Sequence, residues 1–205
     1  MFLHMLRAII IICVLVQVGC SSQDKTPVNN ARSSNTAPAA ATPVEVKPTM
    51  GEATMTLPKD WQPFEQQQTK VAKDVESISF IRRIDRSLWA NPGPAGTANL
   101  PMMNLQISRR PADARRDDIE PKRLGNNLVK QGHLTKLVEA GEIKVANLSA
   151  SRIVGDSSTQ GRVFIVLLPN NSYLYKWTLF GVKPNDTQSS AAFDTLLSSV
   201  QFTNK

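Results

Sequence analysis

The sequence VFIVLL at residues 163–168 consists of six consecutive apolar side chains. Side chains on a β-strand point alternately to the two faces of its sheet, so a run without a polar position is typical of a strand that is covered on both faces. Arg162 precedes the run, and the turn-forming residues Pro169–Ser172 follow it. This stretch therefore predicts a central strand of a sheet that has a further layer on each side.

Further strands are predicted on both sides of this run. Met103, Leu105 and Ile107 alternate with polar neighbours, which predicts a half-buried strand. The expected strands occupy residues 55–57, 75–83, 103–107, 146–154, 162–168, 173–182 and 201–203. Residues 134–145 are expected to form two strands joined by a turn at Gly141.

Two segments have the spacing of amphipathic helices. One is expected to begin at Asp117 and to end at Gly132, because acidic residues stabilise a helix N-terminus and glycine favours a helix end. The other is expected to be capped by Asn185 or Asp186. Its apolar face carries Phe193, Leu196, Leu197 and Val200. We therefore expect an α/β protein, a three-layer α/β/α sandwich with a central, mainly antiparallel sheet.

Cysteine and histidine are too scarce for several kinds of site. The only cysteines are Cys13 and Cys20, and the histidines are His4 and His133. A disulfide, a cysteine-based metal site and a histidine cluster of the zinc type are therefore not expected. The sequence has no Gly-x-Ser-x-Gly, phosphate-loop or dinucleotide-binding glycine pattern. We predict no catalytic residue, no metal site and no cofactor, and we expect that the protein is not an enzyme.

The N-terminus has the organisation of an export signal. Arg7 precedes the apolar run 8–16, which is shorter than the roughly 20 residues of a membrane-spanning helix. Residues 17–20, Gln-Val-Gly-Cys, resemble the lipobox of bacterial lipoproteins, with Gln17 where leucine is usual. The resemblance implies cleavage before Cys20 and acylation of its sulfur, which anchors the chain in a membrane. Two alternatives are secretion after an ordinary signal peptide and an uncleaved N-terminal anchor.

The chain is therefore expected to have three parts: a signal peptide (residues 1–19), a lipidated cysteine with a disordered linker (20–49) and one folded domain (50–205). The linker is rich in Ser, Asn, Thr, Ala and Pro, and its few large apolar residues cannot offset the entropy of ordering. The expected location is the cell envelope, facing the periplasm. Enteric lipoproteins with Asp after the cysteine stay at the inner membrane, so Ser21 favours the outer membrane over the inner.

Four segments of the expected domain resemble the PsbP-like superfamily, which includes DcrB-like envelope lipoproteins. The matching segments are Leu57–Trp61, Ser79–Arg82, Gly161–Phe164 and Phe193–Phe202. Together they span roughly residues 50 to 203. The resemblance implies an α/β/α sandwich that serves binding and assembly, and it brings no catalytic motif.

Arginines form the candidate binding surface. Arg82 and Arg83 end one expected strand, and Arg109 and Arg110 end another, so the two pairs are expected to meet at one rim of the sheet. Such a rim would attract anionic lipid, glycan or an acidic partner. The alternative is that these arginines are solvated strand ends paired with neighbouring acids. Nucleic acid is not an expected partner, because an export signal separates the protein from it and no recognition motif accompanies the charge.

These observations lead to two main functional hypotheses, with an enzyme as a third and less favoured one. The first is an envelope lipoprotein, attached to the membrane through acylated Cys20, whose non-catalytic domain binds an envelope protein. The second is a lipoprotein that binds a small anionic or apolar ligand, such as a lipid or glycan, through the arginine rim or the loop at residues 91–97.

Acylation of Cys20 has a direct test. We expect metabolic labelling with palmitate to mark the chain, and we expect Cys20→Ser to abolish the label because no other cysteine remains after the signal peptide. Labelling that persists in the Cys20→Ser chain contradicts the assignment.

Overall fold

The computed structural model describes residues 43–64, 69–72, 74–90, 100–110 and 119–203. Residues 39–205 form one compact unit. Its strands are β1 (Glu45–Val46), β2 (Ala53–Thr56), β3 (Trp61–Pro63), β4 (Thr69–Ala72), β5 (Val75–Arg82), β6 (Met102–Arg109), β7 (Lys136–Val145), β8 (Leu148–Ser157), β9 (Gly161–Asn170), β10 (Tyr173–Val182) and β11 (Gln201–Phe202). Its helices are η3 (Arg83–Asp85), α2 (Arg86–Ala90), α3 (Pro121–Lys130) and α4 (Thr187–Ser198).

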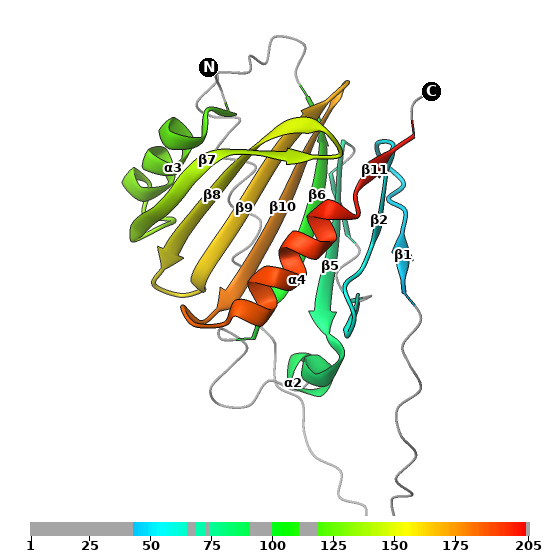
Figure 1. Ribbon diagram of the computed structural model, residues 1–205, viewed down its shortest axis with the longest axis horizontal. Coiled ribbons are helices and arrows are strands. Elements are labelled where there is room, and N and C mark those ends of the chain that lie inside the picture. The colour runs from blue at the N-terminus through cyan, green and yellow to red at the C-terminus, as the bar shows by residue number, and fades with distance from the viewer. Residues whose placement is uncertain (1–42, 65–68, 73, 91–99, 111–118, 204–205) are drawn as a thin grey trace, which may run out of the picture. The chain divides into compact units, whose positions relative to one another are not determined.

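The strands form two antiparallel sheets (Figure 1). The large sheet has eight strands in the order β3-β5-β6-β10-β9-β8-β7, and β4 also pairs with β5. The small sheet has the order β1-β2-β11. All the pairings in both sheets are antiparallel. The predicted central strand is confirmed: β9 lies inside the large sheet, between β10 and β8.

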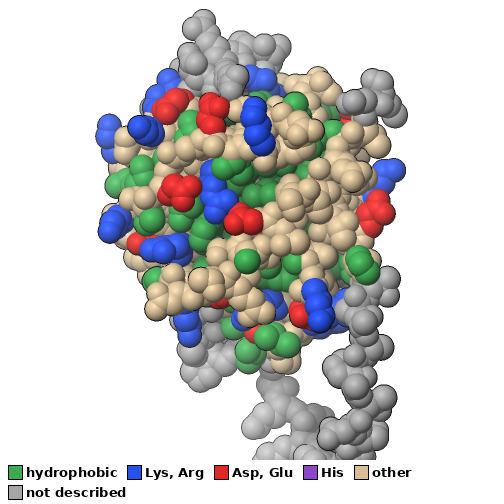
Figure 2. Space-filling model, in the orientation of Figure 1, with side chains coloured by type: hydrophobic (Ala, Val, Ile, Leu, Met, Phe, Trp, Pro, Cys, Tyr) green, Lys and Arg blue, Asp and Glu red, His purple; other side chains and the backbone are tan. Residues whose placement is uncertain are grey.

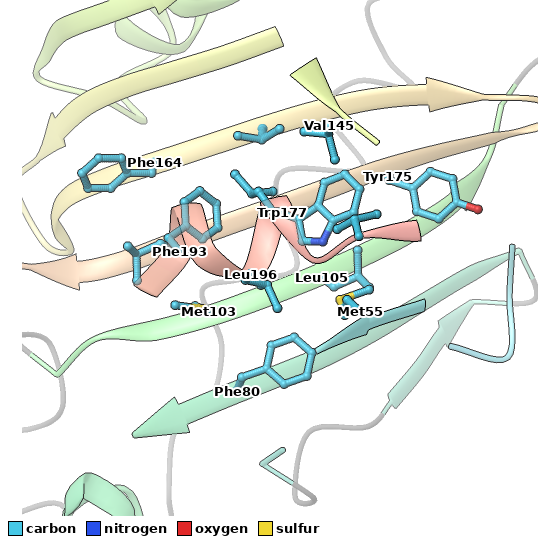
Figure 3. Packing of buried hydrophobic residues seen from close by; sticks show 14 of the residues in the cluster. Met55, Phe80, Met103, Leu105, Val145, Phe164, Tyr175, Trp177, Phe193 and Leu196 are labelled. Carbon is cyan, nitrogen blue, oxygen red and sulfur yellow. The ribbon is translucent and has the colours of Figure 1, made fainter. Parts of the chain in front are cut away.

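Helix α4 and the small sheet cover one face of the large sheet (Figure 1). Phe193 and Leu196 of α4 are fully buried, and Met55 of β2 is almost so. They join one core cluster with sheet residues such as Phe80, Leu105 and Trp177 (Figure 3). The apolar face predicted for residues 193–200 is therefore the face that packs on the sheet.

Helix α3 covers the other face, over β7 and β8. A Cβ atom at Gly125 of α3 would lie 2.7 Å from the Leu137 side chain of β7. A Cβ atom at Gly155 of β8 would lie 2.5 Å from the side chain of Leu134, which follows α3. Gly155 pairs with Leu137, so both lie on this face, whereas Val154 points to the α4 face. The molecule is therefore the three-layer α/β/α sandwich that the sequence predicts.

Described residues before the expected domain start at residue 50 also pack on the domain. Strand β1 pairs with β2, and Val46 is only 8% exposed. The backbone N–H of Leu57 also donates a hydrogen bond to the Val44 carbonyl (2.8 Å). The segment 43–49 thus belongs to the domain, because its two valines add apolar surface to the core. The signal peptide, Cys20, the linker up to residue 42 and the loop 91–97 lie outside the described residues.

Two other boundaries differ from the sequence prediction. Helix α3 begins at Pro121, not at Asp117, because the side chain of Glu120 accepts hydrogen bonds from the N–H groups of Lys122 and Arg123 and caps the helix there. Residues 136–145 form one strand through Gly141, not two strands with a turn. Gly141 pairs with Arg152 across the ladder, so the long partner strand β8 keeps this glycine extended.

The packing of α4 on the sheet gives the first stability prediction. Phe193→Ala removes a fully buried ring that contacts Phe164 at a centroid distance of 6.3 Å. We expect a loss of about 3–5 kcal/mol in the free energy of unfolding, measured by denaturant titration. Gln188→Ala, at an exposed position of the same helix, is the control and is expected to change stability by less than about 0.5 kcal/mol. Equal effects of the two substitutions would contradict this packing.

Candidate functional site

The structure does not bring the two predicted arginine pairs together. Strands β5 and β6 are antiparallel, with Ile81 opposite Met102 and Val75 opposite Ser108. Arg82 therefore lies at the end of β5 where β6 begins, and Arg109 lies at the far end of β6. Arg109 lies seven positions after Met102 on β6, a distance of about 23 Å along the strand. The prediction that the two arginine pairs meet at one rim is wrong, because the C-terminal ends of adjacent antiparallel strands lie at opposite ends of the sheet.

Each pair instead has acidic neighbours of its own. The Nε atom of Arg82 lies 2.6 Å from Asp85 Oδ2, and the Nε atom of Arg109 lies 3.3 Å from Asp74 Oδ1. Arg83 is exposed, and the backbone N–H of Arg110 bonds to the Ser172 carbonyl (2.7 Å). Arg82 and Arg109 thus follow the alternative reading, in which arginines at strand ends pair with nearby acids.

A cleft of about 350 Å³ lies beside Arg83, and sequence reasoning did not find it. Its walls come from the start of the domain, from the segment before β3 and from the C-terminal half of α4. The lining residues are Pro43, Val44, Thr56, Leu57, Pro58, Lys59, Asp60, Trp61, Arg83, Thr195, Ser198 and Ser199. In the sequence, Leu57–Trp61 stands out only by its resemblance to the family, and its position across the cleft from α4 is a property of the fold.

The backbone around the cleft is held by hydrogen bonds from distant segments. The Ser199 hydroxyl bridges the backbone of Thr56, accepting from its N–H (2.9 Å) and donating to its carbonyl (3.0 Å). The N–H of Arg83 donates to the carbonyl of Asp60 (2.7 Å). These bonds fix the end of β2 to the end of α4, and the segment before β3 to the end of β5.

The alternating aromatic residues of β10 belong to the core. Tyr175 is 1% exposed and Trp177 is fully buried, and their rings stack at a centroid distance of 5.7 Å. Phe202 of β11 packs edge-on against Tyr175 at 5.1 Å, and the Tyr175 hydroxyl accepts a hydrogen bond from the Glu52 N–H (3.0 Å). These rings therefore join the two sheets and are core residues, not a stacking platform for a ligand.

Arg152 is an inward-facing charge that sequence reasoning missed. It lies on β8 between Ala150 and Val154, on the α4 face. Its Nη1 atom lies 2.6 Å from Asp194 Oδ1 of α4, and its guanidinium lies 5.7 Å from the centre of the Phe164 ring. The signal in the sequence is an arginine at an apolar position of a strand pattern. Its partners make it a link between sheet and helix.

The margin of the large sheet at β7 is exposed. Among the described strands, β7 pairs only with β8, so its other side has no strand beside it. Val138 is 45% exposed, and the charged residues of β7 also face solvent. The exposed charged residues are Lys136, Glu139, Glu142 and Lys144. Charges on an edge strand hinder random pairing with other chains but leave its backbone accessible to a matched partner.

The described part of the chain has neither a cluster of metal-ligating residues nor a membrane-spanning helix. Its His, Cys, Asp and Glu residues contain no group of three that could hold a metal ion. None of the helices there is both long and apolar enough to cross a membrane.

His133 is exposed, and its backbone N–H donates to the Leu128 carbonyl at the end of α3 (3.0 Å), as expected for a residue after a helix end.

Comparison with known proteins identifies the fold. No family model and no curated protein matches the sequence. The solution structure of cyanobacterial PsbP (CyanoP) from Synechocystis sp. PCC 6803 is similar, with a TM-score of 0.54 and 14% identity over 83% of this chain and 98% of that one. The crystal structure of LpqN, involved in cell envelope biogenesis of Mycobacterium tuberculosis, gives a TM-score of 0.51 and 12% identity over 80% of this chain and 91% of that one.

The protein therefore has a PsbP-like fold, as the four matching segments of its sequence predict. The coverage of both chains places the likeness over the described domain as a whole, not over a single motif. At such low identity the likeness concerns the fold only.

Tyr175 gives a spectroscopic test of the junction between the two sheets. Burial raises the pKa of its phenol above the ordinary value, although the hydrogen bond from the Glu52 backbone lowers it in part. The chain has two tyrosines, so Tyr173→Phe leaves Tyr175 as the only one. We expect its absorbance titration in the folded state to have a midpoint above about 10, the value of a free tyrosine.

The sign of the linked stability follows from that shift. Because the folded state holds the proton more tightly, the contribution of Tyr175 is complete below pH of about 10 and declines as the pH rises towards the folded-state pKa. Tyr175→Phe is expected to remove this decline. A midpoint at or below 10 in the folded Tyr173→Phe chain contradicts the buried junction.

Proposed function

We propose that the protein is a non-catalytic binding domain of the cell envelope, tethered to a membrane through acylated Cys20, and that it binds an envelope protein. The observation that carries the proposal is the exposed edge of the large sheet at β7. An extended segment of a partner would add to this edge through main-chain hydrogen bonds, and its side chains would meet those of β7.

The length of β7 supports a specific contact. The strand has ten residues and alternates between exposed and half-buried side chains over most of its length. Lys136, Glu139, Glu142 and Lys144 offer charges of both signs, so a partner strand is selected by complementary charge as well as by backbone pairing. Gly155 of β8 is buried and has no side chain, so Leu134 and α3 pack closely on the sheet next to β7. This packing holds the backbone of β7 in place.

The envelope location is supported by the sequence and by one neighbour. The apolar run, Gly19 and Cys20 resemble a lipoprotein signal, and the remaining chain has no further cysteine that would need a partner. LpqN, which shares the fold, is described as involved in cell envelope biogenesis. The proposed location is the outer membrane, with the domain facing the periplasm. Ser21 supports it, because enteric lipoproteins that stay at the inner membrane have aspartate at this position.

The second candidate is binding of a small ligand at the Arg83 cleft. The cleft combines a lysine, an arginine and an aspartate with hydroxyl groups of α4, which suits a polar or anionic molecule. Because Arg109 and Arg110 lie at the other end of the sheet and Arg82 pairs with Asp85, this candidate keeps only Arg83 of the predicted rim.

Photo-cross-linking in intact cells tests the first candidate. A photoreactive amino acid at Val138 or Lys144 of β7 is expected to trap one discrete protein, and the same probe at exposed Gln188 of α4 is not. The partner is expected to co-purify with the acylated chain from detergent-solubilised membranes. Adducts that are absent from β7, or equally frequent at residue 188, contradict binding at this edge. A bound lipid or glycan without a protein supports the second candidate instead.

A further inference from the structure

The segment that follows β5 exposes two large apolar side chains. Ile84 is 74% exposed and Leu88 is 48% exposed, the highest values among the large hydrophobic residues described. Single exposed apolar residues are ordinary on protein surfaces. These two are four residues apart on consecutive helical turns, η3 and α2, so they lie on the same side of the segment.

The inner side of the same segment is anchored to the domain. Asp85 is 5% exposed and is bound by Arg82 of β5 (2.6 Å). The ring of Trp89 packs against that of Phe64 at a centroid distance of 6.1 Å. Asp85 and Trp89 are also four residues apart, and each directly follows one of the exposed residues. The side of the segment that carries Asp85 and Trp89 faces the domain, and the side that carries Ile84 and Leu88 faces solvent. The exposure is therefore built into a fixed turn.

Cations flank the two apolar side chains. Arg83 and Arg86 are exposed on the same segment, and Lys59 is exposed at the cleft next to Arg83. Among the described residues of this segment and of the cleft lining, the acids are Asp85, which is neutralised by Arg82, and Asp60. Figure 2 shows hydrophobic and basic side chains together at the lower end of the domain, where Figure 1 places α2. Apolar tips surrounded by arginines are typical of a surface that enters an anionic lipid interface.

The start of the domain lies beside this segment. Pro43, the first described residue, lines the same cleft as Arg83. A tether from Cys20 would therefore join the domain at the end that carries α2. The tip of the β7–β8 hairpin, with Leu148, lies by strand register at the opposite end of the sheet.

From these observations we propose that Arg83, Ile84, Arg86 and Leu88 form a docking surface for an anionic lipid bilayer. The two apolar side chains enter the interface, and the two arginines contact lipid phosphates. This orients the tethered domain with α2 towards the membrane. The proposal rests on the tether of the proposed function for its geometry, but not on the protein partner at β7.

The test uses purified chain from residue 20 onward with Cys20→Ser, so that no acyl chain contributes to binding. This chain contains no other cysteine, and a single cysteine at position 84 or 88 can carry an environment-sensitive fluorophore. Leu148→Cys is the matched control, because Leu148 is also an exposed apolar residue, at 36%. Vesicles of phosphatidylcholine with or without phosphatidylglycerol are the probes.

We expect labels at positions 84 and 88 to shift to shorter emission wavelength with phosphatidylglycerol vesicles, and the label at 148 to stay unchanged. Arg83→Glu with Arg86→Glu is expected to weaken vesicle binding about tenfold or more, and added salt is expected to weaken it as well. Ile84→Ser with Leu88→Ser is expected to weaken it without lowering stability, because both side chains are exposed.

Three results overturn the docking surface: no shift at 84 and 88, an equal shift at 148, or binding that the arginine reversals leave unchanged. A shift that appears without vesicles as the protein concentration rises assigns the patch to a second copy of the chain and also overturns it. Since purified lipid is the only binding partner present, these outcomes are independent of the cross-linking at β7.

Discussion

Burial of the large sheet on both of its faces is the constraint on which the rest of the structure depends. Val163 and Leu167 of β9 are buried on the α3 face, and Phe164, Val166 and Leu168 on the α4 face. A sheet with two apolar faces exposes several hundred square ångströms unless a layer covers each side, and hydrophobic burial is the dominant favourable term in folding. The placement of α3, α4 and the small sheet follows from this requirement.

The small sheet has a second role, because it connects the ends of the domain. Strand β11 near the C-terminus pairs with β2, and β2 pairs with β1 at the start of the domain. The Tyr175 hydroxyl, on the large sheet, accepts a hydrogen bond from the Glu52 N–H just before β2. The Ser199 hydroxyl, at the end of α4, accepts one from the Thr56 N–H of β2. The point where a tether would join the domain is thus tied to the core, and the neighbouring α2 segment takes a defined position relative to it.

The two proposed binding surfaces lie where this architecture leaves backbone or apolar side chains uncovered. The edge strand β7 is long and charged, which suits a selective partner, whereas the α2 segment presents apolar tips among arginines, which suits a lipid interface. The two features lie on different parts of the domain. In the proposed arrangement, with the α2 segment on the membrane, the sheet edge at β7 therefore stays accessible to a partner.

The sequence by itself determined the type of most elements and the fold. The strands at residues 103–107 and 163–168 and the helix that carries the apolar face of residues 193–200 were predicted correctly. These predictions succeed because the periods of 2.0 and 3.6 residues follow from local backbone geometry. Only the tertiary structure decided which strand ends meet. Antiparallel register put Arg82 and Arg109 at opposite ends, and the Arg83 cleft arose from contact between segments more than a hundred residues apart. Periodicity tells which face a side chain occupies, but not which distant segment lies beside it, and a site depends on both.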